Sequence, residues 1–207
     1  MRMPALSVDL RAWVRPALGG LGLLLVFLLG LWAFFPWSAA GELLFARLSL
    51  KAAGSGIVVS AAAQEVEGRF APTLTYRGVR LKTSFVEGFC REAALKLSPA
   101  GLLGGAARAV LTLDRGALVL PDRQEAKWTD GGARFRVSPS ELRMEDFRLR
   151  GSFSADGSLI LELPQGTPRG WDVSLKVPDP LDRTLNMVQY LMPLKRTAPG
   201  AWRTQGP

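Results

Sequence analysis

Side chains able to do chemistry are few in this sequence, and the residue type most used for catalysis near neutral pH is absent. The chain has no histidine among its 207 residues. Because no other side chain titrates near neutrality without a large environmental shift, Ser-His-Asp and Cys-His catalysis and histidine-ligated metals are excluded. The single cysteine, Cys90, rules out an intrachain disulfide and leaves zinc without its usual set of ligands.

The densest group of carboxylates is Glu141, Glu145 and Asp146. Two neighbouring carboxylates could act as a general acid and a general base. These three alternate with Arg143 and Arg148, which is typical of a solvated strand face with balanced charge. We therefore expect this group to be structural.

Other nucleophiles and bases lack the neighbours that would activate them. Cys90 is expected to be a small buried residue, although Arg91 would lower its pKa if both were exposed. Lys51 and Lys82 could act as bases only if buried. No Gly-x-x-x-x-Gly-Lys loop is present. We expect no enzymatic activity, no cofactor and no metal site.

The chain is basic, with a formal net charge of +8. The positive residues are spread along strand-like segments, and no run of five or more occurs. This pattern favours a solvated basic surface over a nucleic-acid-binding stripe. We expect no nucleic-acid partner.

The elements that would position these groups begin with an uncharged apolar run at residues 17–35. A helix of this length spans roughly 28 Å, close to the hydrocarbon core of a bilayer. The sequence therefore predicts a single transmembrane helix. Its membrane-anchoring residues are expected to be Leu18, Leu21, Leu23, Leu24, Leu25, Val26, Phe27, Leu28, Leu29, Leu31, Trp32, Phe34 and Phe35.

The charges that flank this run predict its orientation. Arg11 and Arg15 precede it, and the next positive residue is Arg47. The positive-inside rule then places residues 1–16 in the cytoplasm and the remainder outside it. Trp37 follows the run, where an indole favours the headgroup region, and we expect it at the membrane interface.

A cleaved signal peptide is the alternative for the N-terminal segment. Ser38, Ala39 and Ala40 satisfy the small-residue rule of signal peptidases. The apolar run is longer than a usual signal-peptide core, so we expect a retained anchor. Mature protein beginning at Gly41 would decide for cleavage.

Residues 36–54 are predicted to form a juxtamembrane helix, with Ser38 as its N-cap and Gly54 at its end. Leu44 and Leu48 give this helix an apolar side. That side could pack on the following domain or lie on the membrane surface, and the sequence leaves both open.

From residue 55 the hydropathy period approaches two, which predicts strands. We expect residues 55–207 to form a single antiparallel β-rich domain with short helices, either a curved open sheet or a sandwich. The chain is therefore predicted to be mainly β. Strands are expected at 57–61, 73–81, 93–98, 109–120, 141–164 and 171–177.

Several breaks in the strand pattern are predicted as well. Gly78 should be a bulge or turn, and both Asp114-Arg115-Gly116 and Ala155-Asp156-Gly157 should be hairpin turns. Residues 98–105 fit a short helix or an apolar turn, and residues 181–194 have helical spacing. The C-terminal tail contains Pro and Gly and is expected to be loosely held.

The order of segments resembles a known family. An N-terminal anchor ending in "FFP" is followed by "GIVVSA", "FAPTLTYRGVRL" and "ALKLSPAGLLGGAARAVLTLDRGALVL". Later come "LRMEDFRLRGSFSADGSLILEL" and "LDRTLNMVQYLMPLKRTAPGAW". The order is similar to that of the type II secretion system protein N family, and to the wider AsmA-like group.

The resemblance implies an accessory protein of the type II secretion machinery, anchored in the cell inner membrane with its bulk in the periplasm. Other secretion-machinery proteins would be its partners, and it would have no catalytic activity. The alternative is a lipid-handling protein of AsmA-like or lipopolysaccharide-transport type. In that case apolar strand faces, such as Leu111 with Leu113 or Leu159 with Leu161 and Leu163, would line a groove for acyl chains.

Overall fold

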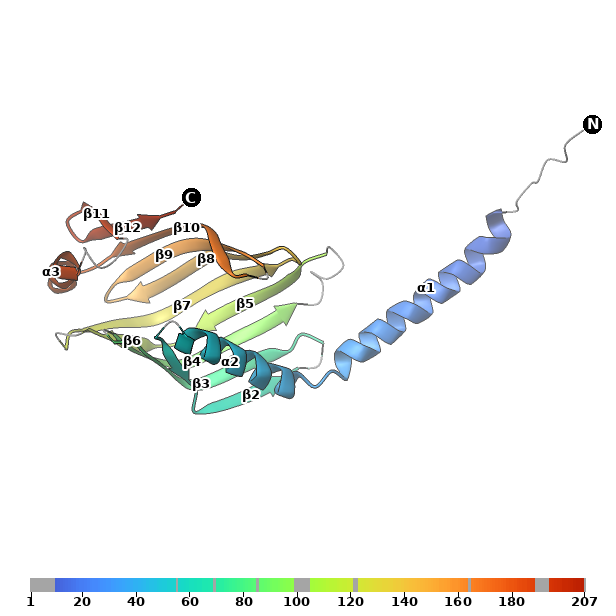
Figure 1. Ribbon diagram of the computed structural model, residues 1–207. Helices are drawn as coiled ribbons and strands as arrows, with labels where there is room; N and C mark the ends of the chain where they lie inside the picture. The colour runs from blue at the N-terminus through green and yellow to red at the C-terminus, as the bar shows by residue number, and fades with distance from the viewer. Residues whose placement is uncertain are drawn as a thin grey trace, which may run out of the picture. The chain divides into compact units, whose positions relative to one another are not determined.

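The computed structural model describes residues 10–54, 56–68, 70–84, 86–98, 105–120, 123–163, 165–188 and 194–206, and for residues 10–19 and 21 it describes the backbone. The chain divides into two compact units, Met1–Pro36 and Trp37–Pro207. Within the described residues, the first contains one helix, and the second contains two helices and a large sheet (Figure 1).

The helices form where the hydropathy pattern leaves the period of two. α1 (Leu10–Ala33) forms the first unit, and its leucine-rich sequence has high helix propensity. α2 (Trp37–Gly54) opens the second unit. α3 (Asp179–Val188) confirms the helix predicted at residues 181–194 as far as Val188. Residues 189–193 lie outside the described residues. Leu181 and Leu185 lie one turn apart in α3.

Twelve strands are present in the part of the chain that the structure describes, and they form one antiparallel sheet. The strands are β1 (Val58–Ser60), β2 (Ala63–Glu67), β3 (Thr73–Lys82), β4 (Glu87–Ser98), β5 (Ala107–Leu113), β6 (Gly116–Val119), β7 (Glu125–Val137), β8 (Glu141–Gly151), β9 (Ser154–Glu162), β10 (Thr167–Lys176), β11 (Lys195–Ala198) and β12 (Ala201–Gln205). The mainly β prediction is confirmed, and of its two alternatives the single sheet is the one found.

Neighbours in the sheet follow the chain closely, in the order β1-β3-β4-β5-β7-β8-β9-β10-β12-β11. β2 continues the line of β1 along β3, and β6 continues the line of β5 between β4 and β7. The sheet is curved (Figure 1). In the sheet, β2–β4 lie on one side of β7 and β8–β12 lie on the other. Because the pairing is antiparallel throughout, residues directly opposite each other share a face.

One face of the sheet carries an apolar row that crosses eight strands. We call this face the inner face and the row the inner row. Its members are Tyr76, Ala93, Leu113, Gly131, Leu149, Ala155, Leu175 and Trp202, each directly opposite the next. Four of them are buried, and Trp202 is only 1% exposed. Full burial of large apolar side chains contributes about 1.5–3 kcal/mol each, so this row is a main source of stability.

The core extends from the inner row toward α3. Leu149 and Ala155 belong to a buried cluster with Trp128, Phe153 and Leu181. Leu181 comes from the first turn of α3 and is 6% exposed. The apolar side of the amphipathic helix α3 therefore covers this end of the inner face.

The hairpin turn predicted at Asp114-Arg115-Gly116 is wrong. β5 and β6 do not pair with each other but lie end to end between β4 and β7. Gly116 is required for packing, because an added Cβ would lie 2.0 Å from the ring of Trp128, its cross-strand neighbour. The Trp128 indole also donates a hydrogen bond of 2.8 Å to the Asp114 carbonyl across the break.

The turn predicted at Ala155-Asp156-Gly157 is also misplaced. The hairpin exists, but its turn lies at Ser152-Phe153, and residues 155–157 are part of β9. Gly157 allows the close approach of β10, since an added Cβ would lie 2.8 Å from the Asp172 carbonyl oxygen. In the sequence, a glycine that is needed for close packing of strands looks the same as a glycine in a turn, and this explains the misplaced prediction.

The C-terminal tail is held firmly, contrary to expectation. β12 pairs with β10 over five residues and contributes Trp202 to the inner row. The interruption predicted at Gly78 is confirmed, because this residue has a φ of 60° inside β3. The segment 98–105 lies largely outside the described residues, so its predicted helix or turn stays a prediction.

Candidate functional site

The apolar residues of α1 and of the two positions that follow it are largely exposed. Exposed fractions run from 46% for Leu29 to 83% for Phe34 among Leu23, Leu24, Leu25, Val26, Phe27, Leu28, Leu29, Leu31, Phe34 and Phe35. Trp32 is half-buried. The side chains of Leu18, Leu21, Arg11 and Arg15 lie outside the described residues.

No single helix in the described part of the chain combines the length and apolarity needed to cross a membrane. The apolar part of α1, Gly22–Ala33, passes that criterion only together with α2, as a broken pair and on length and composition alone.

The apolar helix ends slightly earlier than expected. α1 stops at Ala33 and α2 starts at Trp37, with Pro36 between them. Ser38 is therefore a residue of the first turn of α2 and not its N-cap. Its backbone carbonyl accepts a hydrogen bond of 3.0 Å from the Gln64 side chain on β2.

The first half of α2 docks on β2 and β3 through a small set of contacts. Gly41 is buried, and its carbonyl accepts a hydrogen bond of 3.1 Å from the Tyr76 hydroxyl. The rings of Phe45 and Tyr76 stack with centroids 5.1 Å apart. An added Cβ on Gly41 would lie 3.1 Å from Leu74 and 2.5 Å from Gln64. Glycine at this position thus allows the helix to approach the sheet closely.

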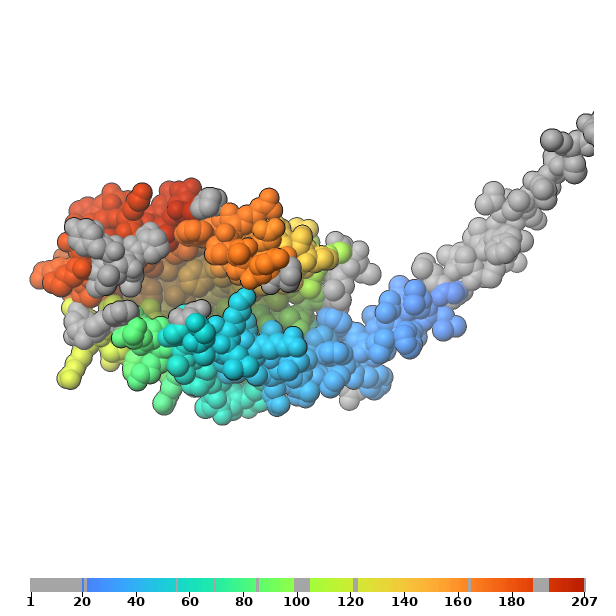
Figure 2. Space-filling model, viewed as in Figure 1, coloured from blue at the N-terminus to red at the C-terminus, as the bar shows by residue number. Residues whose placement is uncertain are grey.

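The end of α2 reaches the opposite part of the sheet. The Lys51 ammonium lies against Gly166, in the turn between β9 and β10. Figure 2 shows the end of α2 meeting this turn on the face in view. α2 therefore bridges the inner face, from β2–β3 to the β9–β10 turn.

A second side of α2 carries exposed leucines. Leu43, Leu44, Leu48 and Leu50 are 41–74% exposed. The two alternatives for this helix are therefore not exclusive. One side of α2 packs on the domain, and another side presents apolar surface.

Two of the three carboxylates that could have been catalytic, Glu141 and Asp146, are held in ion pairs. Glu141 pairs with Arg143 at 3.1 Å, and Asp146 pairs with Arg134. Asp146 has a φ of 49°, at a bulge where the register of β7 and β8 shifts. This arrangement matches the charge-balanced strand face predicted for them.

The candidate nucleophile and bases are not brought together. Cys90 is 8% exposed, its Sγ lies 3.1 Å from the Glu92 carbonyl oxygen, and burial raises the pKa of its thiol. Lys82 is exposed and pairs with Glu87 at 2.8 Å, which raises the pKa of the lysine. Lys51 lies against Gly166, in the turn between β9 and β10. No cluster of Cys, Asp and Glu suited to a metal ion occurs among the described residues.

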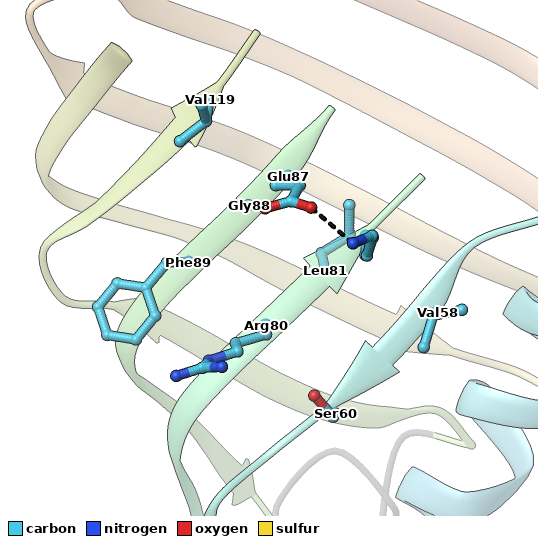
Figure 3. Close-up of a pocket in the computed structure, with 9 residues that line it drawn as sticks. Val58, Ser60, Arg80, Leu81, Glu87, Gly88, Phe89 and Val119 are labelled. Carbon is cyan, nitrogen blue, oxygen red and sulfur yellow. Dashed lines mark ion pairs between the residues drawn. The ribbon is translucent and has the colours of Figure 1, made fainter. Parts of the chain in front are cut away.

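A hollow of about 440 Å³ lies where β1, β3, β4 and β6 meet. Val58 and Phe89 form exposed apolar walls, 59% and 45% exposed. In Figure 3 the Arg80 guanidinium lies beside the Phe89 ring, and the Lys82–Glu87 pair lies further along the same strands. Such a mixture of apolar walls and charged groups is suited to protein contacts.

Asp182, in the first turn of α3, is a buried charged residue. It is 7% exposed and accepts hydrogen bonds from the Trp202 indole and from Arg196. Burial alone would raise its pKa, but the bonds from Trp202, Arg196 and the Gly200 backbone outweigh burial and lower the pKa. An Asp in a helix and a Trp twenty residues later in the tail form no recognisable sequence motif, so the sequence alone does not predict this contact.

Together these features define a β-sheet domain that an apolar helix precedes in the chain. Its surface hollows and exposed apolar side chains are the candidate contact sites. The chain matches the family model described as type II secretion system protein GspN-like, Synergistales, over residues 14–206, and it belongs to that family. No curated protein and no solved structure matches the chain.

Proposed function

We propose that this protein is an accessory component of the type II protein secretion machinery, anchored in the inner membrane and acting through protein–protein contacts. Membership of the GspN-like family carries the proposal. The ion-paired carboxylates and the buried Cys90 support action by contact and not by catalysis.

The anchor and its orientation are part of this proposal. The exposed apolar residues of α1 and the exposed leucines of α2 support contact with a bilayer at the start of the chain. Arg11 and Arg15 before the apolar run support a cytoplasmic N-terminus and a periplasmic sheet domain.

Gene deletion followed by assay of exported enzymes in the medium tests the secretion role. We expect exported enzymes to accumulate in the periplasm of the deletion strain and secretion to return with the full-length gene. Normal secretion in the deletion strain, with intact membranes, would contradict the proposal. A plasmid encoding a chain with Leu25→Arg and Val26→Arg separates anchoring from the sheet domain, since two charges in the apolar run oppose insertion.

Lipid binding in the sheet is the second candidate function. The inner face carries a further apolar row, separated from the inner row by one intervening row of residues. All of its members are only half-buried: Leu97, Ala109, Phe135, Met144, Leu159 and Trp171. Mass spectrometry of lipids that remain with the purified protein after exchange into a lipid-free detergent tests it. Retained phospholipid that is lost in a Leu159→Glu variant would support this function, and a lipid-free protein would contradict it.

A further inference from the structure

Three arginines lie side by side across neighbouring strands on the outer face of the sheet. Arg108 on β5 is directly opposite Arg136 on β7, and Arg136 is directly opposite Arg143 on β8. We call these three residues the arginine row. Directly opposed side chains have their Cβ atoms about 5 Å apart, and like charges in such pairs are destabilising.

Among the described residues, two members of the arginine row have no acidic partner. Arg143 pairs with Glu141 at 3.1 Å, and the neighbouring Arg134 pairs with Asp146. No ion pair between described residues includes Arg108 or Arg136, and both are exposed. The adjoining segment 99–104 lies outside the described residues, but its sequence contains no acid.

The surface beside these two arginines is hollowed. A depression of about 320 Å³ is lined by Arg108, Arg136, Arg134 and Glu145, with Val110 between them. Val110 is 46% exposed, so the lining of the depression includes apolar surface. Two guanidinium groups without an acidic partner, beside this apolar side chain, fit a ligand that carries carboxylates next to an apolar group.

We propose that the arginine row is the docking site for an acidic segment of a partner protein, whose carboxylates pair with Arg108 and Arg136 while an apolar side chain covers Val110. Binding relieves the repulsion within the row, because each carboxylate accepts hydrogen bonds from a guanidinium fork. This inference rests on the proposed function in one respect, that the chain acts through protein contacts.

The acidic groups around the depression favour a protein over an anionic membrane as the occupant. Glu145, Asp146 and Glu141 all lie close to the row. A continuous anionic surface would bring its charges against these carboxylates as well as against the arginines. A protein segment places discrete charges and can match both signs, which is how interfaces gain specificity.

Peptide binding to the full-length protein in neutral-lipid nanodiscs tests the proposal. The probe is a fluorescent peptide of alternating Glu and Val, and the control peptide has Gln in place of Glu. We expect the Glu peptide to bind more tightly, and the double variant Arg108→Gln with Arg136→Gln to weaken binding at least about tenfold. The matched control is Arg91→Gln with Arg115→Gln, which removes the same charge elsewhere on the surface and should change binding less than about twofold.

Equal binding by the two double variants, or equal binding of the two peptides, would overturn the proposal. Displacement of the Glu peptide by glycerol phosphate but not by free glutamate would assign the row to phosphate headgroups and would also overturn it. The secretion assay stays separate, because loss of secretion on gene deletion together with failed peptide binding would overturn only the docking site.

Discussion

The Trp202 indole donates a hydrogen bond of 2.7 Å to Oδ1 of Asp182, and this bond joins the last strand of the sheet to α3. Arg196 on β11 donates to the other carboxylate oxygen. One buried carboxylate thus connects α3, β11 and β12. Trp202 is also the last member of the inner row, so the end of the sheet and the helix that covers it share one polar contact.

Removal of the indole donor should destabilise the domain more than removal of a similar donor nearby. Trp202→Phe keeps an aromatic ring in the inner row but leaves the carboxylate without one of its donors. We expect a loss of about 1–3 kcal/mol in urea unfolding of the detergent-solubilised protein. Trp171→Phe is the matched control, because its indole donates to the half-exposed Thr204 hydroxyl at 3.1 Å, and the cost should stay below about 1 kcal/mol. Equal losses in the two variants would contradict this account.

Stability should fall in acid, with Asp182 as a main cause. The pKa of Asp182 is lower in the folded protein than its ordinary value of 3.8. A carboxyl group with a lowered folded pKa stabilises the protein above its unfolded pKa, and this contribution is lost as the pH falls through the folded value. Thermal unfolding between about pH 5 and pH 2 should therefore show a falling midpoint, and Asp182→Asn should flatten the curve.

The control for this pH dependence is Asp172→Asn. The pKa of Asp172 is also lowered, by its hydrogen bonds with Arg203, but that pair is largely exposed, with exposed fractions of 43% and 50% for the two side chains. Solvent screening weakens such pairs, so this variant should follow the wild-type curve more closely. A wild-type curve that is flat in acid would rule out the Asp182 contribution.

Docking of α2 should depend on the absence of a side chain at Gly41. Gly41→Ala places a Cβ 2.5 Å from the Gln64 amide nitrogen and 3.1 Å from Leu74, so the Gln64 side chain must move and its hydrogen bond to the Ser38 carbonyl is lost, at a cost of about 1 kcal/mol. Gly54→Ala is the matched control at the end of the same helix, where an added Cβ meets nothing within 4 Å. Hydrogen exchange of the α2 amides should speed up in the first variant and not in the second. Unchanged exchange in Gly41→Ala would show that docking of α2 does not depend on the absence of a side chain at this position.

The sequence predicts the class of fold well and the turns less well. Alternation of apolar residues identifies β3, β8 and β9, because each strand buries only one side. The same alternation cannot tell a turn glycine from a packing glycine. At Gly116 and Gly157 the cause of the glycine is a neighbour far away in sequence, Trp128 in one case and the β10 backbone in the other.

Contacts between distant segments also explain what was missed at the candidate sites. Asp182 becomes a buried acceptor only because β11 and β12 return to α3. The arginine row exists only in the register of three strands. By contrast, the pairing of Glu141 with Arg143 could be predicted, because the two residues lie two positions apart on β8. Asp146 pairs instead with Arg134 of β7, which the register of the two strands brings beside it.

A substitution at Gly116 separates the two explanations of this glycine. A turn glycine tolerates Asn better than Ala, since Asn adopts left-handed turn conformations. A packing glycine tolerates neither, because any Cβ would lie 2.0 Å from the Trp128 ring and 2.3 Å from the Phe89 carbonyl oxygen. We expect Gly116→Asn and Gly116→Ala both to lose about 3 kcal/mol in urea unfolding. Retention of wild-type stability by the Asn variant would restore the turn explanation.

The orientation of the chain can be tested with single cysteines, because the native thiol should not react. Cys90 is buried, and burial raises the pKa of its thiol, so little thiolate forms at pH 7. We expect the wild-type protein to stay unlabelled by a membrane-impermeant maleimide until it is unfolded. In a Cys90→Ala background, Ser7→Cys reports on the segment before the apolar run, and Thr167→Cys reports on an exposed position of the sheet domain.

With the outer membrane permeabilised and the inner membrane intact, Thr167→Cys should label and Ser7→Cys should label only after detergent is added. We expect this outcome because Arg11 and Arg15 precede the apolar run, and the positive-inside rule favours a cytoplasmic N-terminus. Labelling of both positions before detergent would place both ends outside the cytoplasm and contradict the proposed orientation. A shorter mature chain that lacks the Ser7→Cys label under all conditions would instead show that the N-terminal segment is cleaved, and the exposed leucines of α2 would then be the remaining apolar surface at the start of the protein.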